Sequence, residues 1–197
     1  MFKVGITGGI GSGKTLVCSV LESLGVPIYS ADSKARRLMN ENPVLKSSIE
    51  ALLGREAYIE GELDRRFVAR KVFGNPILLD KLNQLVHPAV RDDFHSWSLT
   101  WPEASYVVEE AAILFESGAS SHLDMSVLVY APIHIRILRV MQRDGVDRED
   151  VERRMEHQMD EEEKRVLADE VICNDEKSML LPQIIALHNT ILKTRVN

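Results

Sequence analysis

Residues 8–15 read GGIGSGKT, and four of the first six of these residues are glycine. Glycine has no Cβ atom, so such a loop can bring its backbone close to another group, although glycine weakens helices and strands. The loop follows an apolar run at residues 2–6 and precedes residues 16–24, where apolar side chains recur at helical spacing before Gly25. The chain is therefore constrained to begin as a strand, a tight backbone loop and a helix.

The spacing of this loop, two glycines five residues apart followed by Lys and Thr, is that of a phosphate-binding loop. Such loops hold phosphate with backbone N–H groups and the positive end of the following helix. We expect Lys14 to reach the β- and γ-phosphates of ATP and the Thr15 hydroxyl to bind Mg²⁺. A glycine-rich turn with no ligand is the alternative, which the flanking strand and helix disfavour. The expected nucleotide-binding residues are Gly8, Gly9, Gly11, Ser12, Gly13, Lys14, Thr15 and Leu16.

Five short apolar runs are separated by helical patterns, which is typical of an α/β fold with a parallel sheet. About 70 residues between the second and third runs have helical patterns and no strand pattern, so we expect an inserted helical lobe at about 34–101. Residues of about 134–167 are helical and densely charged, as in a lid. The remaining ranges, 1–33, 102–133 and 168–197, would form the core of a single domain. The strand candidates are residues 2–6, 26–30, 104–110, 125–131 and 170–174.

Composition excludes several classes of partner. The net charge of −6 argues against a general nucleic-acid binder. No apolar stretch reaches the roughly 18 residues that a membrane span needs, and no signal-peptide pattern opens the chain. Cys18 and Cys173 lie in apolar runs without metal-ligand spacing, as expected of reduced, buried thiols. We expect a cytoplasmic protein, with a monomer favoured and no nucleic-acid or membrane partner.

A phosphate-binding loop occurs in kinases, GTPase switches and motor ATPases. The chain lacks the Asn-Lys-x-Asp motif that reads guanine and the signature of transporter ATPases. An inserted lobe and an arginine-rich segment favour a small-molecule kinase whose lid excludes water. The alternatives are a kinase for a nucleoside or nucleotide, and a regulatory module that binds ATP without transferring phosphate.

The sequence resembles the dephospho-CoA kinase family almost end to end. The resemblance implies a P-loop NTPase fold like that of nucleoside monophosphate kinases, with a five-stranded parallel sheet in the order 2-3-1-4-5 and helices on both faces. It also implies ATP- and Mg²⁺-dependent phosphorylation of the ribose 3′-hydroxyl of dephospho-CoA, the final step of coenzyme A synthesis. The segments that carry it are ITGGIGSGKT, VPIYSADSKARRL, LDRRFVARKVFGNP, LNQLVHPAVR, ILFESG, RILRVMQRDG, RRMEHQ and ADEVICN.

For the acceptor, the resemblance implies that Asp32 is a base or an orienting carboxylate for the attacking hydroxyl. A helix N-cap is the alternative. Ser30 stands where the family usually has a second Asp, which leaves Asp32 as the sole candidate there. Arg36, one helical turn later, is expected to bind the acceptor.

Glu110 ends the third strand candidate, where the family usually has Asp, and Ala112 replaces a usual proline nearby. A carboxylate at this strand end could hold a water ligand of Mg²⁺ or meet the acceptor. A solvated strand end is the alternative interpretation.

Arg139 and Arg143 are spaced i, i+4 and so share a helix face. We expect them to clamp the ATP phosphates when the lid closes, with Arg143 among the catalytic residues together with Lys14 and Asp32. A solvated charged face is the alternative. Arg136 stands where many members of the family have Gln.

His87 and Arg91 would share a face of a helix that begins at Pro88, and the resemblance places them against the acceptor. A packed or capping histidine is equally compatible with the pattern. Asn174 ends the last strand candidate and could contact adenine, or could simply form a turn.

Overall fold

The computed structural model describes residues 1–72 and 74–194. The chain divides into two compact units. The first unit contains residues 1–30 together with the chain from residue 98 onward, and the second contains residues 31–97.

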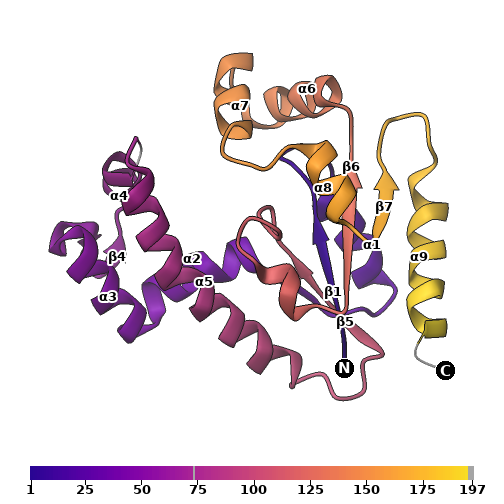
Figure 1. The fold of residues 1–197 in the computed structure, drawn as a ribbon, viewed down its shortest axis with the longest axis horizontal. Helices are drawn as coiled ribbons and strands as arrows, with labels where there is room; N and C mark the ends of the chain where they lie inside the picture. The colour runs from indigo at the N-terminus through magenta and orange to yellow at the C-terminus, as the bar shows by residue number, and fades with distance from the viewer. Residues whose placement is uncertain (73, 195–197) are drawn as a thin grey trace. The chain divides into compact units, whose positions relative to one another are not determined.

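The first unit is built on a five-stranded sheet in which all neighbouring strands are parallel. Its order is β2-β5-β1-β6-β7, so the second, third, first, fourth and fifth of the predicted strands lie side by side (Figure 1). The predicted sheet and strand order are confirmed, and the observed strands end close to the predicted positions. The strands are β1 Phe2–Thr7, β2 Ile28–Ser30, β5 Tyr106–Glu110, β6 Met125–Tyr130 and β7 Glu170–Cys173.

The main core lies between one face of this sheet and the helices α1, Lys14–Ser23, and α9, Leu180–Thr194. Strand side chains alternate between faces, so every second residue of a strand reaches this core. Burial of each such aliphatic side chain stabilises the fold by about 1.5–3 kcal/mol. The buried members are Val4, Ile6, Val17, Cys18, Leu21, Val26, Tyr106, Val108, Val127, Val129, Ile172, Ile184, Leu187 and Ile191.

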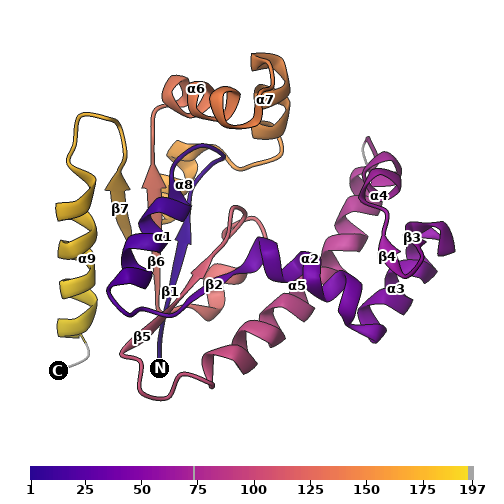
Figure 2. The same cartoon turned by 180° about the vertical axis from the view of Figure 1, so that it is seen from behind.

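A short helix, α8, Glu161–Leu167, covers the opposite face of the sheet, as the two opposed views show (Figures 1 and 2). Helices α6, Ile133–Asp144, and α7, Arg148–Met155, follow β6 and pack together through a small cluster of Ile137, Val140 and Val151. These three helices occupy the segment in which the sequence predicted a charged helical lid.

The described residues of the second unit form four helices and a small hairpin. The hairpin was not predicted from the sequence. The hairpin pairs β3, Tyr58–Ile59, with β4, Glu62–Leu63. Its turn residues Glu60 and Gly61 have φ angles of 49° and 89°, as in the turns that suit two-residue hairpin loops. Strands of two residues are too short for an alternating pattern, so only the Glu-Gly turn signalled the hairpin. The helices are α2 Ala31–Glu41, α3 Pro43–Leu53, α4 Arg65–Val72 and α5 Pro76–Ser98, with a 3₁₀ turn at Arg55–Ala57.

Helix α5 does not begin at Pro88, as the sequence pattern suggested. It begins at Pro76, where the Asn75 side chain accepts a hydrogen bond of 3.1 Å from Leu78 N–H, and it continues through Pro88. Proline costs an internal helix one hydrogen bond, which the length and packing of α5 tolerate. His87 and Arg91 are therefore one turn apart on the same continuous helix.

The two cysteines are free, and they differ in exposure. Cys18 is buried in the core, where burial and, secondarily, the negative charge of Glu110 raise the pKa of its thiol. Cys173 is only partly buried, so the expectation of two buried thiols is wrong for this residue.

We expect the native protein to react with about one equivalent of the thiol reagent DTNB and with about two after unfolding, because only a thiolate reacts readily. A Cys173→Ser variant should remove the native reaction. Rapid native reaction at both cysteines would contradict the burial of Cys18.

Candidate active site

The glycine-rich loop joins β1 to α1 and needs glycine for reasons of both space and backbone conformation. Gly11 and Gly13 have φ angles of 81° and 98°, which side chains other than glycine rarely adopt. A Cβ atom on Gly13 would collide with Nδ2 of Asn174, and one on Gly11 would come within 2.5 Å of the Arg136 carbonyl oxygen. The loop is therefore closely surrounded on its outer side.

The later N–H groups of the loop are left without acceptors. Ser12 N–H donates to the Gly9 carbonyl at 3.0 Å, but the N–H groups of Gly11, Gly13 and Thr15 have no acceptor among the described residues. They lie at the start of α1, where the helix dipole adds positive potential. This arrangement favours an anion with several oxygen atoms.

Lys14 and Thr15, at the head of α1, are both held near the loop. Lys14 Nζ donates to the Gly8 carbonyl at 2.6 Å, and Thr15 Oγ1 donates to Glu110 Oε1 at 2.9 Å. Glu110 pairs with Ile6 in the sheet register and follows Tyr106 and Val108 on the strand face that packs against α1. The structure thus brings Thr15, the predicted Mg²⁺ ligand, together with Glu110, which was predicted to hold a water ligand of Mg²⁺ or to meet the acceptor.

These donors fit Mg²⁺, a hard cation that usually takes one or two protein oxygens and completes its shell with phosphate and water. The described residues contain no group of three or more His, Cys, Asp or Glu side chains that could hold a metal ion on their own. A cation at Thr15 and Glu110 would therefore depend on oxygens from a bound phosphate.

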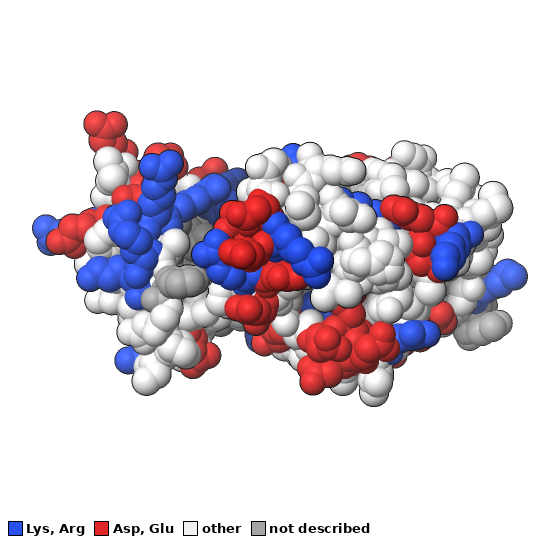
Figure 3. Space-filling view, turned by 90° about the horizontal axis from the view of Figure 1, so that it is seen from above, with Lys and Arg blue, Asp and Glu red and all other residues white. Residues whose placement is uncertain are grey.

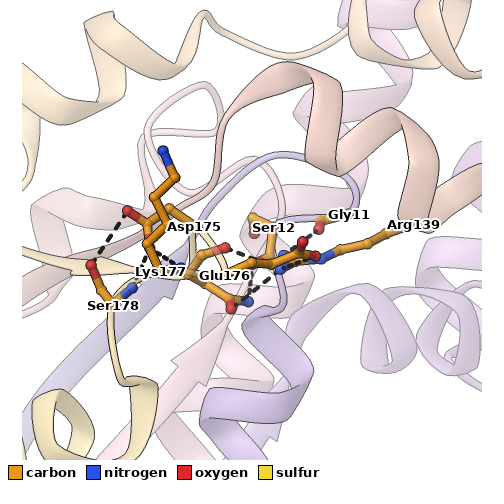
Figure 4. Close-up of polar contacts among 8 residues, drawn as sticks. Gly11, Ser12, Arg139, Asp175, Glu176, Lys177 and Ser178 are labelled. Carbon is orange, nitrogen blue, oxygen red and sulfur yellow. Dashed lines mark hydrogen bonds and ion pairs between the residues drawn. The ribbon is translucent and has the colours of Figure 1, made fainter.

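Arg139 and Asn174, both predicted to bind nucleotide, meet at the loop. Figure 4 shows Arg139 pointing toward Gly11 and Ser12. Arg139 Nη2 donates to the Asn174 backbone oxygen at 3.1 Å and to Glu176 Oε1 at 3.2 Å, and its Nη1 is 3.5 Å from the Gly11 carbonyl. Asn174 Nδ2 donates to the Ser12 carbonyl at 2.8 Å. Both side chains therefore position the loop, while a contact of Asn174 with adenine stays a prediction.

Arg143 is not brought to the loop. Its side chain is 62% exposed, and its Nε donates to Asp144 Oδ1 at 2.7 Å. Hydrogen bonds from Arg143 and from Arg154 lower the pKa of Asp144 to about 2. A contact between Arg143 and phosphate stays a prediction, and it would require this ion pair to open.

The surface of α7 carries acidic and basic side chains side by side (Figure 3). Arg148 pairs with Glu152, and Arg153 pairs with Asp150, within the same helix. Such exposed pairs contribute little to stability. Arg148 and Arg153 thus belong to a solvated charged surface. The alternative interpretation of a solvated face fits the exposed Arg143, whereas Arg139 contacts the loop.

Four of the five predicted acceptor-side residues lie in the second unit, and the fifth, Glu110, lies in the first. Asp32 is the second residue of α2 and lies inside its first turn, so it is not the N-cap that the alternative interpretation proposed. Arg36 follows one turn later on the same helix. On α5, burial and then the charge of Arg91 lower the pKa of His87. Arg91 Nε is buried and has no hydrogen-bond partner within residues 1–72 and 74–194.

Sequence reasoning missed two side chains that bind the first half of the loop. Glu161 Oε1 accepts a hydrogen bond of 2.7 Å from Gly9 N–H, and Gln158 Oε1 accepts one of 2.9 Å from Ile10 N–H. Gln158 belongs to the segment RRMEHQ, which carried part of the family resemblance. The sequence pattern gave no indication that Glu161 and Gln158 bind the loop, because each lies about 150 positions from the loop residue that it contacts.

Lys164 is a further missed residue, since it lies in a charged run that predicted an exposed face. It is fully buried, with Nζ 3.0 Å from Glu116 Oε1 and 3.1 Å from the Ala112 carbonyl. Glu116 also accepts a hydrogen bond from Met159 N–H at 2.9 Å. These bonds fix the start of α8 against the segment that follows β5.

The family model for dephospho-CoA kinase matches residues 2–179 of the chain. The chain belongs to the dephospho-CoA kinase family. The dephospho-CoA kinase of Bacteroides fragilis is 37% identical over 185 residues, which cover 94% of this chain and 90% of that protein. The predicted family and its kinase class are confirmed.

Two solved structures extend the similarity to the fold. A crystal structure from Thermus thermophilus has a TM-score of 0.83 and 38% sequence identity, and the match covers 98% of this chain and 97% of the other. A dephospho-CoA kinase from Campylobacter jejuni has a TM-score of 0.71 and 26% identity, with 98% of both chains covered. The P-loop kinase fold expected of the dephospho-CoA kinase family is confirmed.

Proposed function

We propose that this protein transfers the terminal phosphoryl group of ATP to the ribose 3′-hydroxyl of dephospho-CoA, the final step of coenzyme A synthesis. The observation that carries the proposal is the set of N–H groups of Gly11, Gly13 and Thr15 at the head of α1, which lack acceptors among the described residues of a chain of this family. A phosphate chain would supply the missing acceptors.

The residues of the first unit fit ATP and Mg²⁺. When bound, ATP supplies the phosphoryl group and Mg²⁺ supplies positive charge at its phosphates. The loop N–H groups and Lys14 would hold the phosphates, while Thr15 and Glu110 would hold the cation directly or through water. Arg139, at Gly11, would neutralise negative charge at the same end of the loop, and Arg143 would join it after leaving Asp144.

The acceptor side of the proposal rests on the family pattern. Asp32 would orient the 3′-hydroxyl and accept its proton, and Arg36, His87 and Arg91 would bind other parts of dephospho-CoA. The buried Nε of Arg91, which has no hydrogen-bond partner in the part of the chain that the structure describes, supports an anionic or hydrogen-bonding ligand at α5. Transfer through a loose transition state depends strongly on positioning, so Asp32 would have to orient the hydroxyl as well as accept its proton.

Purified protein should be tested with ATP and Mg²⁺ against a panel of acceptors that contains dephospho-CoA, AMP, adenosine and shikimate, with ADP release as the readout. We expect dephospho-CoA to be preferred by orders of magnitude. A preference for AMP or adenosine would show a nucleotide or nucleoside kinase instead. ATP binding without turnover on any acceptor would show a regulatory module.

We also propose a cytoplasmic monomer without a nucleic-acid or membrane partner. The net charge of −6 and the two free cysteines support this. None of the described helices is both long and apolar enough to cross a membrane. Light scattering of the purified protein would test the oligomeric state.

Changing Glu110 to Gln should raise the Mg²⁺ concentration needed for half-maximal activity by about three- to tenfold, because the cation loses one charged oxygen ligand. ATP binding measured without Mg²⁺ should change little. Glu110→Asp restores the usual family residue and serves as the matched control, with a Mg²⁺ requirement near that of the wild type. An unchanged Mg²⁺ requirement in Glu110→Gln would exclude Glu110 from the cation site.

A further inference from the structure

The first half of the phosphate loop is held by side chains from the other end of the chain. Gly9 N–H donates to Glu161 Oε1 at 2.7 Å, and Ile10 N–H donates to Gln158 Oε1 at 2.9 Å. The later N–H groups of the loop remain available for phosphate, as described above. One half of the loop is thus fixed from the side of α8, while the other half is open to a ligand.

The contact at Gly9 involves two buried charges that are only partly satisfied. Glu161 is 6% exposed and Arg136 is 7% exposed. Oε2 of Glu161 and Nε of Arg136 have no hydrogen-bond partner among the described residues, and no ion pair joins the two side chains there. Neither charge is neutralised by a direct bond to the other.

Gly9 lies against both of these charged groups. A Cβ atom at this position would collide with Nη1 of Arg136 and would come within 2.8 Å of Glu161 Oε1. The cation from α6 and the anion from α8 therefore flank the same backbone position of the phosphate loop. The absence of a side chain on Gly9 is what allows both groups to approach.

Burying either charge alone costs free energy, and the opposite charge nearby reduces that cost. A buried charge without compensation costs several kcal/mol, and an opposite charge nearby lowers this cost even without a hydrogen bond, because the Coulomb energy falls only as 1/r. A carboxylate at Gly9 would also repel a triphosphate in the same loop. Arg136 offsets that repulsion, so the two side chains together bring almost no net charge to the site.

We propose that Arg136 and Glu161 form a positioning pair for the phosphate loop. Glu161 fixes Gly9 N–H and thereby the first half of the loop, and Arg136 cancels the negative charge that Glu161 brings close to the triphosphate. The inference rests on the proposed use of ATP by this loop. It assigns opposite electrostatic effects on ATP affinity to two residues that touch the same glycine.

The test is a double-mutant cycle that measures dissociation constants for ATP and ADP. Arg136→Gln should weaken ATP binding about tenfold, and ADP binding less, because ADP carries less negative charge. Glu161→Gln keeps an acceptor oxygen for Gly9 and should bind ATP as tightly as the wild type or more tightly. The double variant, in which both charges are absent, should return to within about threefold of the wild type.

Glu162→Gln is the matched control, because Glu162 neighbours Glu161 but is exposed and pairs with Arg165 at 3.7 Å. Its ATP affinity should equal that of the wild type. If Arg136→Gln does not fold, Arg136→Lys and the double variant keep the proposal testable, since both preserve the charge balance and should bind ATP nearly normally. Thermal unfolding measurements show whether each variant is folded.

If Arg136→Gln and the double variant weaken ATP binding equally, the proposed pairing of Arg136 and Glu161 is refuted. It is also refuted if Glu161→Gln weakens ATP binding as much as Arg136→Gln does. An effect of Arg136→Gln that is the same for ATP and ADP would indicate a purely structural role. If the wild type binds ATP but does not phosphorylate dephospho-CoA, the proposed function is refuted. The dissociation constants of the variants for ATP and ADP would then still test the pairing of Arg136 and Glu161. A wild type that does not bind ATP would overturn both.

Discussion

Lys14→Ala should lower kcat/KM for dephospho-CoA by about 10²–10³-fold, the usual cost of removing one preorganised group that stabilises developing charge. Lys14 lies at the head of α1, and its Nζ already reaches back over the loop to the Gly8 carbonyl at 2.6 Å. From this position the ammonium can follow the charge on the β- and γ-phosphates, which no other group of the loop can do over the same range. Steady-state kinetics with ADP release would measure the effect.

The matched control is Lys193→Ala, which removes an exposed lysine from the last turn of α9. Its kcat/KM should equal that of the wild type. Thermal unfolding of Lys14→Ala should show a folded protein, because Lys14 is not a core residue. Retention of more than about a third of the wild-type kcat/KM by Lys14→Ala would show that the loop does not hold the transferred phosphate.

Asp32→Asn should lower kcat by about 10²–10⁴-fold, the range for loss of a positioned acid–base group, and leave the dissociation constant for ATP within about threefold. Asparagine preserves the size of the side chain but removes its ability to accept the hydroxyl proton. The combination of normal ATP binding and low kcat distinguishes a residue of the acceptor site from one of the nucleotide site. Kinetics and direct ATP titration are both needed.

Glu41→Gln is a suitable control for Asp32→Asn, because Glu41 lies on the same helix and forms only an exposed pair with Arg37 at 3.3 Å. It should leave kcat unchanged. If Asp32→Asn keeps normal turnover, the base assignment is wrong. If it loses ATP affinity in proportion to kcat, Asp32 belongs to the nucleotide site.

The local parts of this fold could be predicted from the sequence. The strands were predicted from five apolar runs, and the parallel sheet from the helical patterns between them. This works because the spacing of apolar residues indicates which face of an element is buried. The order of the strands came from the family resemblance. The hairpin at Tyr58–Leu63 was missed because two-residue strands have no periodicity.

The phosphate loop was predicted for the same local reason, since its eight residues are contiguous. The residues that surround it were harder to predict. Lys164 and Glu161 stand in the run EEEKR, which is typical of an exposed helix, yet the structure buries both side chains. Their partners, Glu116 and Gly9, are separated from them by many residues, and a single sequence carries no signal for such contacts.

The burial of Lys164 limits how much of the molecule can rearrange during a catalytic cycle. Its bonds to Glu116 and to the Ala112 carbonyl clamp α8 onto the segment that follows β5, and breaking them would leave a fully buried ammonium unpaired at a cost of several kcal/mol. The segment that can move as a lid is thus shorter than the whole charged region from 134 to 167. We therefore expect any closing motion of this region to leave α8 in place.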